Sequence, residues 1–544
     1  MSRNHTRLDA IIVGAGFAGL YMLHSLRALG FSVRVLEAGS GVGGTWYWNR
    51  YPGVRCDVES IDYSYSFDEN LQQDWQWTER YATQPEILRY IEHVCERFEL
   101  GRDIQLDTRV KEARFDEEAN SWVLHTDTGE RFEATYCIAA VGCLSAVNPP
   151  RFPGLDSFEG DTYHTARWPH EGVDFAGRRV AVVGTGSTGV QAIPLIAEQA
   201  DQLYVFQRSP NFSVPARNRP LDPELQRAIK ADYAARRQAA REAAWGVPND
   251  KPPRPLEDFN AQERVAVCDE GWRKGGAPGM LRAFSDSMTN PEANRVVAEY
   301  VRSKIRTTVR DPAVAEKLVP TDHPLGAKRL CVDTNYYETF NRPNVTLIDV
   351  ASTPIEQITP HGIRTRDAEL SVDAIVFALG FDAITGALLA IDIRGRNGAS
   401  LREKWAAGPR TYLGLGVAEF PNLFTITGPG SPSVLGNVIV SIEQHVEWIA
   451  ACLAYMREHG LDRIEATTAA QDNWVAHVDE VARGTLFVSA KSWFMGANIA
   501  GKPRTFMPYA GGVPTYRRIC DDVARRGYEG FALSASGSLA HSPV

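Results

Sequence analysis

The chain has 544 residues, which predicts roughly two to four domains and a core large enough to need no disulfide or metal staples. Hydrophobic residues make up 44% of the chain and charged residues 23%, which excludes a disordered, collagen-like or low-complexity protein. The formal net charge of −9 gives no indication of nucleic acid or an anionic membrane as a partner.

The cysteines and the hydropathy pattern indicate a compartment. The 8 cysteines are scattered without a CxxC pair, so neither a zinc site nor a disulfide scaffold is indicated. No stretch reaches the ~18 uninterrupted apolar residues of a membrane span. We therefore expect a cytoplasmic protein in a reducing environment that does not bind a membrane.

Residues 9–37 have the pattern of a strand, a turn, a helix and a second strand. An apolar strand at 10–13 is followed by glycines 14, 16 and 19, a helix expected at 20–29 and a strand at 33–36. Such glycines let the backbone approach a pyrophosphate, which the amide groups at the helix start hold. Glu37 closes the second strand, where a carboxylate accepts ribose hydroxyls and repels a phosphate. This unit favours FAD or NAD.

A second unit of the same kind begins at residue 179. A strand at 180–183 precedes the loop Gly184-Thr185-Gly186-Ser187-Thr188-Gly189, a helix to about 198 and a strand at 203–206. Arg208 stands where the first unit has Glu37, and a guanidinium suits the 2′-phosphate of NADP. The alternative is a solvated surface arginine. Two loops of opposite charge preference indicate a flavoprotein oxidoreductase with a flavin and a nicotinamide that reduces it.

The order of these segments predicts an α/β fold with two Rossmann-like dinucleotide-binding domains. We expect a discontinuous FAD domain over 1–145 and 390–544. The NADP domain is expected over 150–385, with a helical insertion at about 220–320 that contains a mobile loop at 246–253. Other expected elements are antiparallel strands around 122–125, strands at 345–349 and 374–379, and a long amphipathic helix at 438–459.

The electron acceptor separates the classes of two-nucleotide flavoprotein. A disulfide reductase needs a redox-active cysteine pair near its flavin. Cys137 and Cys143 are six positions apart at the end of a strand, and we interpret them as small buried residues. Dioxygen is the alternative acceptor.

Two further motifs narrow the class. Residues 158–169 follow the pattern FxGxxxHxxxWP, with Phe158, Gly160, His164, Trp168 and Pro169 at its fixed positions. Residues 43–57 follow GGxWxxxxYPGxxxD. Together with both glycine loops, these motifs resemble the type I Baeyer–Villiger monooxygenases over essentially the whole chain. The resemblance is greatest to the phenylacetone and steroid monooxygenase branch, whose active-site segment is similar to residues 430–435.

The resemblance implies a reaction and its catalytic residues. NADPH reduces FAD, dioxygen forms a flavin peroxide, and the peroxide attacks a ketone to give an ester or lactone; sulfoxidation is also expected. Arg329 matches the catalytic arginine, because a fixed cation in a dry pocket stabilises the negative oxygens that develop. Asp57 is then its carboxylate partner, which orients the guanidinium and favours its charged form. Without the resemblance, Lys328 and Arg329 would be interpreted as a solvated basic pair.

The resemblance also implies the cofactor and substrate contacts. Lys328 is expected beside Arg208 at the 2′-phosphate, and Trp493 is either a mobile-loop tryptophan that closes over NADP or a core aromatic. His164 is expected to position the linker between the domains. The cofactor-binding set is Gly14, Gly16, Phe17, Gly19, Glu37, Gly44, Thr45, Trp46, Trp48, Asp57, Tyr63, Val110, Thr185, Gly186, Ser187, Thr188, Gly189, Gln191, Arg208, Ser209, Lys328, Arg329 and Trp493. The substrate pocket is expected to include Ser433, Val434, Leu435 and Val438.

Two alternatives stay open at this point. A flavin-dependent N- or S-hydroxylating monooxygenase is disfavoured by Trp168-Pro169 at the end of the signature. A nucleotide-binding sensor or scaffold without activity is the other. The expected partners are a small-molecule ketone and dioxygen, with no metal and no nucleic acid, and the chain is expected to be a monomer or weak oligomer.

Overall fold

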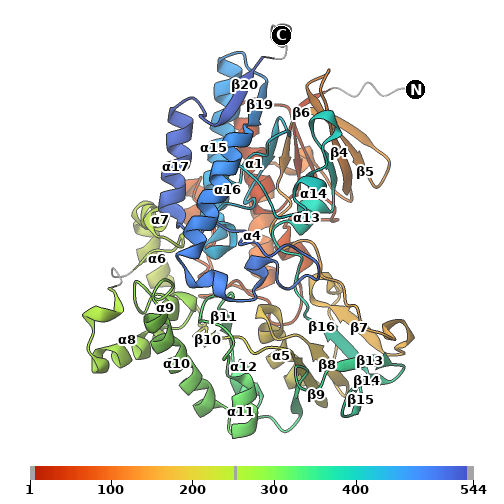
Figure 1. Cartoon of the computed structure of the whole chain (residues 1–544), viewed down its shortest axis with the longest axis vertical. Coiled ribbons are helices and arrows are strands. Elements are labelled where there is room, and N and C mark those ends of the chain that lie inside the picture. Colours follow the sequence, from red (N-terminus) through yellow and green to blue (C-terminus); the bar gives the residue numbers. More distant parts are fainter. Residues whose placement is uncertain (1–6, 250–253, 536–544) are drawn as a thin grey trace.

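The computed structural model describes residues 7–249 and 254–535, and two large sheets organise it. One lies in the upper part of Figure 1, with the N-terminal strands, and the other lies in the lower right. One strand of each sheet leads through a glycine loop into a helix. The predicted α/β class with two Rossmann-like units is therefore confirmed.

The first sheet has the strand order β17-β4-β5-β6-β1-β2-β3, and β18 pairs with β6. The strands from β6 to β3 are parallel, whereas β4, β5 and β6 form an antiparallel meander, as expected around residues 122–125. Two strands from the C-terminal half, β17 and β18, complete this sheet. The bounds are β1 Leu8–Val13, β2 Val33–Leu36, β3 Ile104–Gln105, β4 Val110–Asp116, β5 Ser121–Thr126, β6 Arg131–Ala139, β17 Asp392–Arg394 and β18 Leu423–Thr425.

The second sheet is parallel throughout, in the order β12-β9-β8-β16-β7. Its central strands are almost entirely buried, as their runs of valine and isoleucine require. Its bounds are β7 Asp161–His164, β8 Arg179–Val183, β9 Gln202–Gln207, β12 Val345–Asp349 and β16 Ala374–Phe377. The smaller sheets contain β10 Ser213–Pro215 with β11 Cys331–Asp333, β13 Ile355–Thr359 with β14 Gly362–Thr365 and β15 Glu369–Ser371, and β19 Arg463–Ala466 with β20 Phe531–Ser534.

Helices fill the chain between β10 and β11 and after β18. The first group lies at the left of Figure 1, and residues 250–253 of the expected mobile loop lie outside the described residues. The N-terminal helices are α1 Phe17–Ala28, α2 Thr45–Trp48, α3 Glu69–Asp74, α4 Gln84–Arg97 and α5 Ser187–Gln199. Between β10 and β11 lie α6 Pro223–Ala231, α7 Tyr233–Glu242, α8 Ala261–Lys274, α9 Ala277–Leu281, α10 Pro291–Thr308 and α11 Pro312–Leu318. The remainder are α12 Tyr336–Thr339, α13 Gly386–Leu389, α14 Leu401–Lys404, α15 Val438–Glu458, α16 Thr468–Arg483 and α17 Val513–Arg525.

The first glycine loop shows why its spacing is needed. Gly14 has φ 106°, and a Cβ there would lie 2.6 Å from the carbonyl oxygen of Ala140. A Cβ at Gly19 would lie 1.8 Å from the carbonyl oxygen of Gly14. Helix α1 therefore begins at Phe17, three residues before the expected start, because Gly19 belongs to its first turn.

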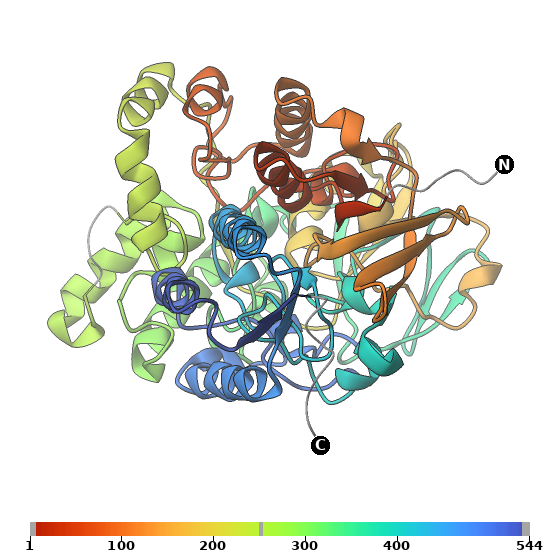
Figure 2. The same ribbon diagram turned by 90° about the horizontal axis from the view of Figure 1, so that it is seen from above.

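Helix α15, in the C-terminal part of the chain, packs against the first nucleotide-binding unit. It packs against α1, and Figure 2 shows the two helices side by side in the middle of the molecule. Arg457 near its end donates to the carbonyl oxygen of Leu29 at 2.8 Å and lies over the ring of Phe31. The predicted long helix at 438–459 is thus present, and its inner face joins the main core.

Candidate functional site

A partly buried ion pair joins two segments that are far apart in the sequence. Arg329, just before β11, donates from Nε and Nη2 to the two carboxylate oxygens of Asp57, both at 2.8 Å. Each side chain is 25% exposed. Two parallel bonds of this kind fix the plane of a guanidinium as well as its position. The structure therefore brings together the two residues predicted to be catalytic.

A third contact comes from the turn before α15. The remaining terminal nitrogen of Arg329, Nη1, donates to the carbonyl oxygen of Val434 at 2.6 Å. Burial by itself would lower the pKa of Arg329, but the adjacent Asp57 carboxylate outweighs it and raises that pKa. Arg329 is thus a permanent cation held from two sides. The sequence placed Val434 in the substrate pocket, and no side-chain pattern could have indicated a backbone acceptor.

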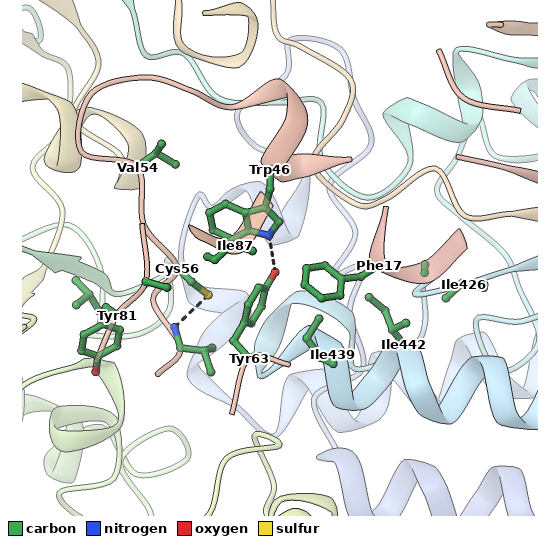
Figure 3. Close-up of a cluster of buried hydrophobic side chains, with 14 of the residues drawn as sticks. Phe17, Trp46, Val54, Cys56, Tyr63, Tyr81, Ile87, Ile426, Ile439 and Ile442 are labelled. Carbon is green, nitrogen blue, oxygen red and sulfur yellow. Dashed lines mark hydrogen bonds between the residues drawn. The ribbon is translucent and has the colours of Figure 1, made fainter. Parts of the chain in front are cut away.

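Aromatic residues from the first unit pack near this pair. The indole N–H of Trp46 donates to the hydroxyl of Tyr63 at 3.2 Å, and the Phe17 ring meets Tyr63 edge-on at 5.5 Å, as Figure 3 shows. Burial raises the pKa of Tyr63 well above its usual value, so its hydroxyl stays neutral. Of the other residues predicted there, Val110 is buried at the start of β4, Trp48 is half-buried and Thr45 is exposed.

The first loop has the features that a dinucleotide needs. Helix α1 has Gly16 at its N-cap and no side-chain cap, so a pyrophosphate can take its first amide groups. Glu37 is 5% exposed and accepts from the backbone N–H groups of Ala15 at 2.7 Å and Gly39 at 2.8 Å. These bonds hold a carboxylate where the ribose of FAD is expected. Gly44 lies against Gly16, which brings the second motif to the same place.

The second loop repeats these features. Helix α5 has Gly186 at its N-cap without a side-chain cap, and a Cβ at Gly186 would meet nothing within 4 Å. The space over this loop is therefore open to a nucleotide. The hydroxyl of Thr185 donates to the carbonyl oxygen of Ser209 at 3.3 Å, and Ser187 lies 3.4 Å from the sulfur of Cys331. The residues present fit NADP.

Three residues predicted at NADP have other partners in the structure. Gln191 Oε1 accepts from the hydroxyl of Tyr51 at 2.8 Å, and a hydrogen bond from Thr188 also reaches Tyr51. Lys328 pairs with Asp322 at 3.4 Å. Arg208, by contrast, is exposed and forms no ion pair within the described residues. Because both side chains are cations, no bond between them is expected without a phosphate, and their shared place at the 2′-phosphate stays a prediction.

The FxGxxxHxxxWP segment packs along the second sheet. A Cβ at Gly160 would lie 2.5 Å from the carbonyl oxygen of Asp373 and 2.6 Å from the ring of Phe158. His164 Nδ1 accepts from the N–H of Ala166, and its Nε2 lies 3.2 Å from the carbonyl oxygen of Asn148. Burial lowers the pKa of His164, so the ring is neutral and bridges two parts of the linker.

The end of the same segment is part of the protein core. Trp168 is 4% exposed and contacts the rings of Tyr163 and Phe175, and Pro169 follows it into a turn. This tryptophan anchors the linker to the second sheet.

The predicted pocket residues line the turn that contacts Arg329. Ser433 is buried, whereas Val434, Leu435 and Val438 are half-buried. Leu435 also lines a cavity of about 90 Å³ together with Trp245 and residues 509–513. Trp493 is half-buried and packs against Phe494 with ring centroids 4.3 Å apart, beside Val434 in an apolar cluster.

Comparison with known proteins identifies the family. The family model described as pyridine nucleotide-disulphide oxidoreductase matches residues 11–242. A solved steroid monooxygenase bound to NADP superposes with a TM-score of 0.93 at 52% identity, covering 97% of this chain and 100% of that one. A Baeyer–Villiger monooxygenase of Pseudooceanicola batsensis is 43% identical over 96% of this chain and 95% of its own length. The chain belongs to the type I Baeyer–Villiger monooxygenase family.

Membership decides the class of reaction and the cofactors. Baeyer–Villiger monooxygenases depend on FAD and NADPH, so the predicted activity and both predicted cofactors are confirmed. Phenazine N-monooxygenase PhzNO1 of Lysobacter antibioticus is also 42% identical over 99% of both chains. Full-length relatives of this chain therefore include an enzyme named for N-oxidation.

Three further findings bear on the earlier expectations. None of the 8 cysteines is in a disulfide, and the Cys143 sulfur instead contacts Thr427 and Ser433. Within residues 7–249 and 254–535, no group of metal-ligating side chains could hold a metal ion. In the same ranges, no helix is both long and apolar enough to span a membrane.

Proposed function

We propose that this Baeyer–Villiger monooxygenase oxidises apolar ketones with Arg329 as its catalytic cation. The observation that carries the proposal is the bidentate Asp57–Arg329 pair at 2.8 Å, held in place by Val434. The overall reaction consumes a ketone, dioxygen, NADPH and a proton, and yields an ester or lactone, water and NADP+. When bound, FAD supplies the redox chemistry, because it takes electrons from NADPH and activates dioxygen.

Arg329 has the donors that this chemistry needs. A guanidinium carries five N–H groups, and three of them go to Asp57 and Val434. One N–H on each terminal nitrogen is left to donate to an oxygen that becomes negative during the reaction. Because the cation is already fixed and partly desolvated, it stabilises such an oxygen without first reorganising. Asp57 acts through Arg329 as a positioning residue.

The remaining assignments follow the same reasoning. We assign FAD to the first glycine loop with Glu37, and NADP to the second with Arg208 and Lys328. The FAD domain then spans 1–145 and 390–544, and the NADP domain spans 150–385 with its helical insertion. The half-buried apolar side chains Val434, Leu435 and Val438 support an apolar ketone, whether linear, aryl, cyclic or steroid. The free cysteines support a cytoplasmic location, and the net charge of −9 supports a protein that binds no nucleic acid. We also propose that the chain is a monomer or weak oligomer.

Product identification tests the proposal. The purified holoenzyme is incubated with NADPH, air and phenylacetone, a cyclic ketone or a steroid ketone, and the products are identified by mass spectrometry. An ester or lactone from at least one ketone is expected. A hydroxylated amine from a parallel amine probe, with no ester from any ketone, would favour the N-oxidising alternative.

Variants of Arg329 test its assigned role. Arg329→Ala should lower ester formation about a hundredfold or more, the typical effect of losing a preorganised donor to a developing oxyanion. Anaerobic bleaching of the flavin by NADPH should persist in that variant. Arg310→Ala removes an exposed arginine and is the matched control. Unchanged ester yield from Arg329→Ala would refute the assignment.

A further inference from the structure

The thiol of Cys143 contacts the turn at Ser433–Leu435, which contains the Val434 carbonyl. Its sulfur is 3.0 Å from the hydroxyl oxygen of Ser433 and 3.3 Å from both the carbonyl and the hydroxyl oxygen of Thr427. Ser433 has φ 44° and Thr427 has φ 55°. Left-handed backbone is unfavourable for residues other than glycine and persists only where the surroundings hold it. Thr427 and Ser433 are the two non-glycine residues with left-handed backbone in segment 427–433, and the Cys143 thiol is hydrogen-bonded to both.

The hydrogen-bonding roles of these groups are consistent. Burial raises the pKa of the Cys143 thiol, so it is a neutral S–H group that can donate. It can donate to the carbonyl oxygen of Thr427, whose own hydroxyl donates to the carbonyl oxygen of Ile426 at 2.7 Å. The hydroxyl of Ser433 has no other partner within residues 7–249 and 254–535, so its proton can point to the sulfur. Cys143 thus acts as donor to one residue and acceptor from the other.

The two ends of the segment are held differently. The N–H of Thr427 donates to Nδ1 of His445 at 2.9 Å, and Nε2 of that buried histidine lies 2.8 Å from the hydroxyl of Tyr516. The Thr427 end is therefore fixed to α15 and α17. At the other end the side chain of Ser433 contacts the Cys143 sulfur, and the next residue is Val434, whose carbonyl accepts from Arg329.

We propose that Cys143 is a positioning residue for ketone oxidation. By linking Ser433 to Thr427, it fixes the Val434 carbonyl. That carbonyl accepts from Nη1 of Arg329 and, together with the two Asp57 bonds, holds the two free N–H groups of Arg329 in their direction. The inference rests on the role proposed above for Arg329. Without the thiol, the turn can relax from its left-handed backbone, and the Arg329 donors are then aimed less well at the reacting oxygen. Flavin reduction does not use those donors and should be insensitive to the change.

The test compares three cysteine variants of the holoenzyme. Cys143→Ala should lower the ester formed per NADPH consumed about five- to tenfold, the size of one lost hydrogen bond. Anaerobic flavin bleaching by NADPH should stay within about twofold of wild type, because the nucleotide loops are unchanged. Cys143→Ser should restore most of the ester yield, since its hydroxyl can make the same two bonds. Cys137→Ala is the matched control, because Cys137 is a buried residue of β6 whose thiol has no hydrogen-bond partner among the described residues.

A second variant keeps the inference testable if Cys143→Ala does not fold. Ser433→Ala removes the donor to sulfur and should lower the ester per NADPH to a similar extent. If both residues act through one contact, the double variant should be no worse than either single variant. Normal ester yield from both single variants, equal losses in ester formation and flavin bleaching, or additive losses in the double variant would each overturn the inference. A wild-type enzyme that forms no ester would instead contradict the proposed function.

Discussion

The hydroxyl of Tyr51 donates a hydrogen bond of 2.8 Å to the side-chain oxygen of Gln191, which joins the loop before Asp57 to helix α5 of the second nucleotide unit. The amide nitrogen of Gln191 returns a bond to the carbonyl oxygen of Arg55 at 3.1 Å. Gly53 lies between them, because a Cβ there would be 2.5 Å from the carbonyl oxygen of Gln191. The Tyr-Pro-Gly part of the second motif is thus one of the places where the two units touch, beside the Asp57–Arg329 pair.

Removing the Tyr51 hydroxyl should loosen this contact. Tyr51→Phe leaves the Gln191 oxygen without its donor, and we expect the free energy of unfolding to fall by about 1–2 kcal/mol. Denaturant titration of the holoenzyme measures the change. Tyr204→Phe is the control, because the Tyr204 hydroxyl has no hydrogen-bond partner in the described part of the chain. Equal stability of the two variants would contradict the importance of the contact.

Arg208 should decide which nicotinamide cofactor the enzyme prefers. Its guanidinium is exposed and free of carboxylate partners in the described ranges, so it can bind a 2′-phosphate. Arg208→Ala should raise the KM for NADPH about tenfold or more and leave that for NADH nearly unchanged, since only NADPH carries this phosphate. Steady-state kinetics with both cofactors measures the ratio, with Arg310→Ala as control. An unchanged preference would make Arg208 an ordinary surface arginine.

The local patterns of the sequence predicted the local structure well. Both glycine loops lie between a strand and a helix, because their φ values and close backbone contacts leave few alternatives. Strands 33–36 and 345–349 were predicted with their observed bounds. The predicted start of helix α1 was three residues too far along the chain, because glycine is unfavourable inside a helix. Gly19 nevertheless lies in the first turn, where its close contact with Gly14 leaves no room for a side chain.

The candidate site could not be predicted from local patterns alone. Arg329 and Asp57 are 272 positions apart, so only the family resemblance paired them. The contact of the Val434 carbonyl with Arg329 could not be predicted, because every residue has a backbone carbonyl and the residue type does not indicate which one accepts. The side chain of Gln191 was expected near the pyrophosphate. In the structure its amide oxygen accepts from Tyr51 and its amide nitrogen donates to the carbonyl oxygen of Arg55, so both groups are hydrogen-bonded to the first unit. Such contacts depend on tertiary packing.

The pH dependence of stability should reveal the buried His445. Burial, helped by Arg517, lowers the pKa of His445 to about 3. In the unfolded chain the imidazole has its ordinary pKa of about 6.5, so below that pH the unfolded state binds a proton that the folded state does not. The contribution of this residue to the free energy of unfolding should therefore fall by up to about 1.4 kcal/mol for each pH unit below 6.5.

Substitution of His445 measures its contribution to the pH dependence of the free energy of unfolding. His445→Gln keeps an acceptor for Thr427 and a donor for Tyr516 but cannot titrate. Its free energy of unfolding should fall less steeply than that of wild type between about pH 6.5 and pH 4.5. Urea titrations across this range measure both slopes, and His125→Gln, at an exposed histidine, is the control. Identical slopes for His445→Gln and wild type would contradict the assignment.

The glycine of the FxGxxxHxxxWP motif should be required for stability. A Cβ at Gly160 would lie 2.5 Å from the carbonyl oxygen of Asp373, which is itself held by the N–H of Asp161 and by Arg178. Because this oxygen cannot move without breaking those bonds, Gly160→Ala should destabilise the fold by about 1–3 kcal/mol. Gly101→Ala is the matched control, since a Cβ at Gly101 would meet nothing within 4 Å. Thermal unfolding should therefore separate the two variants, whereas equal midpoints would mean that β7 and β16 can move apart at little cost.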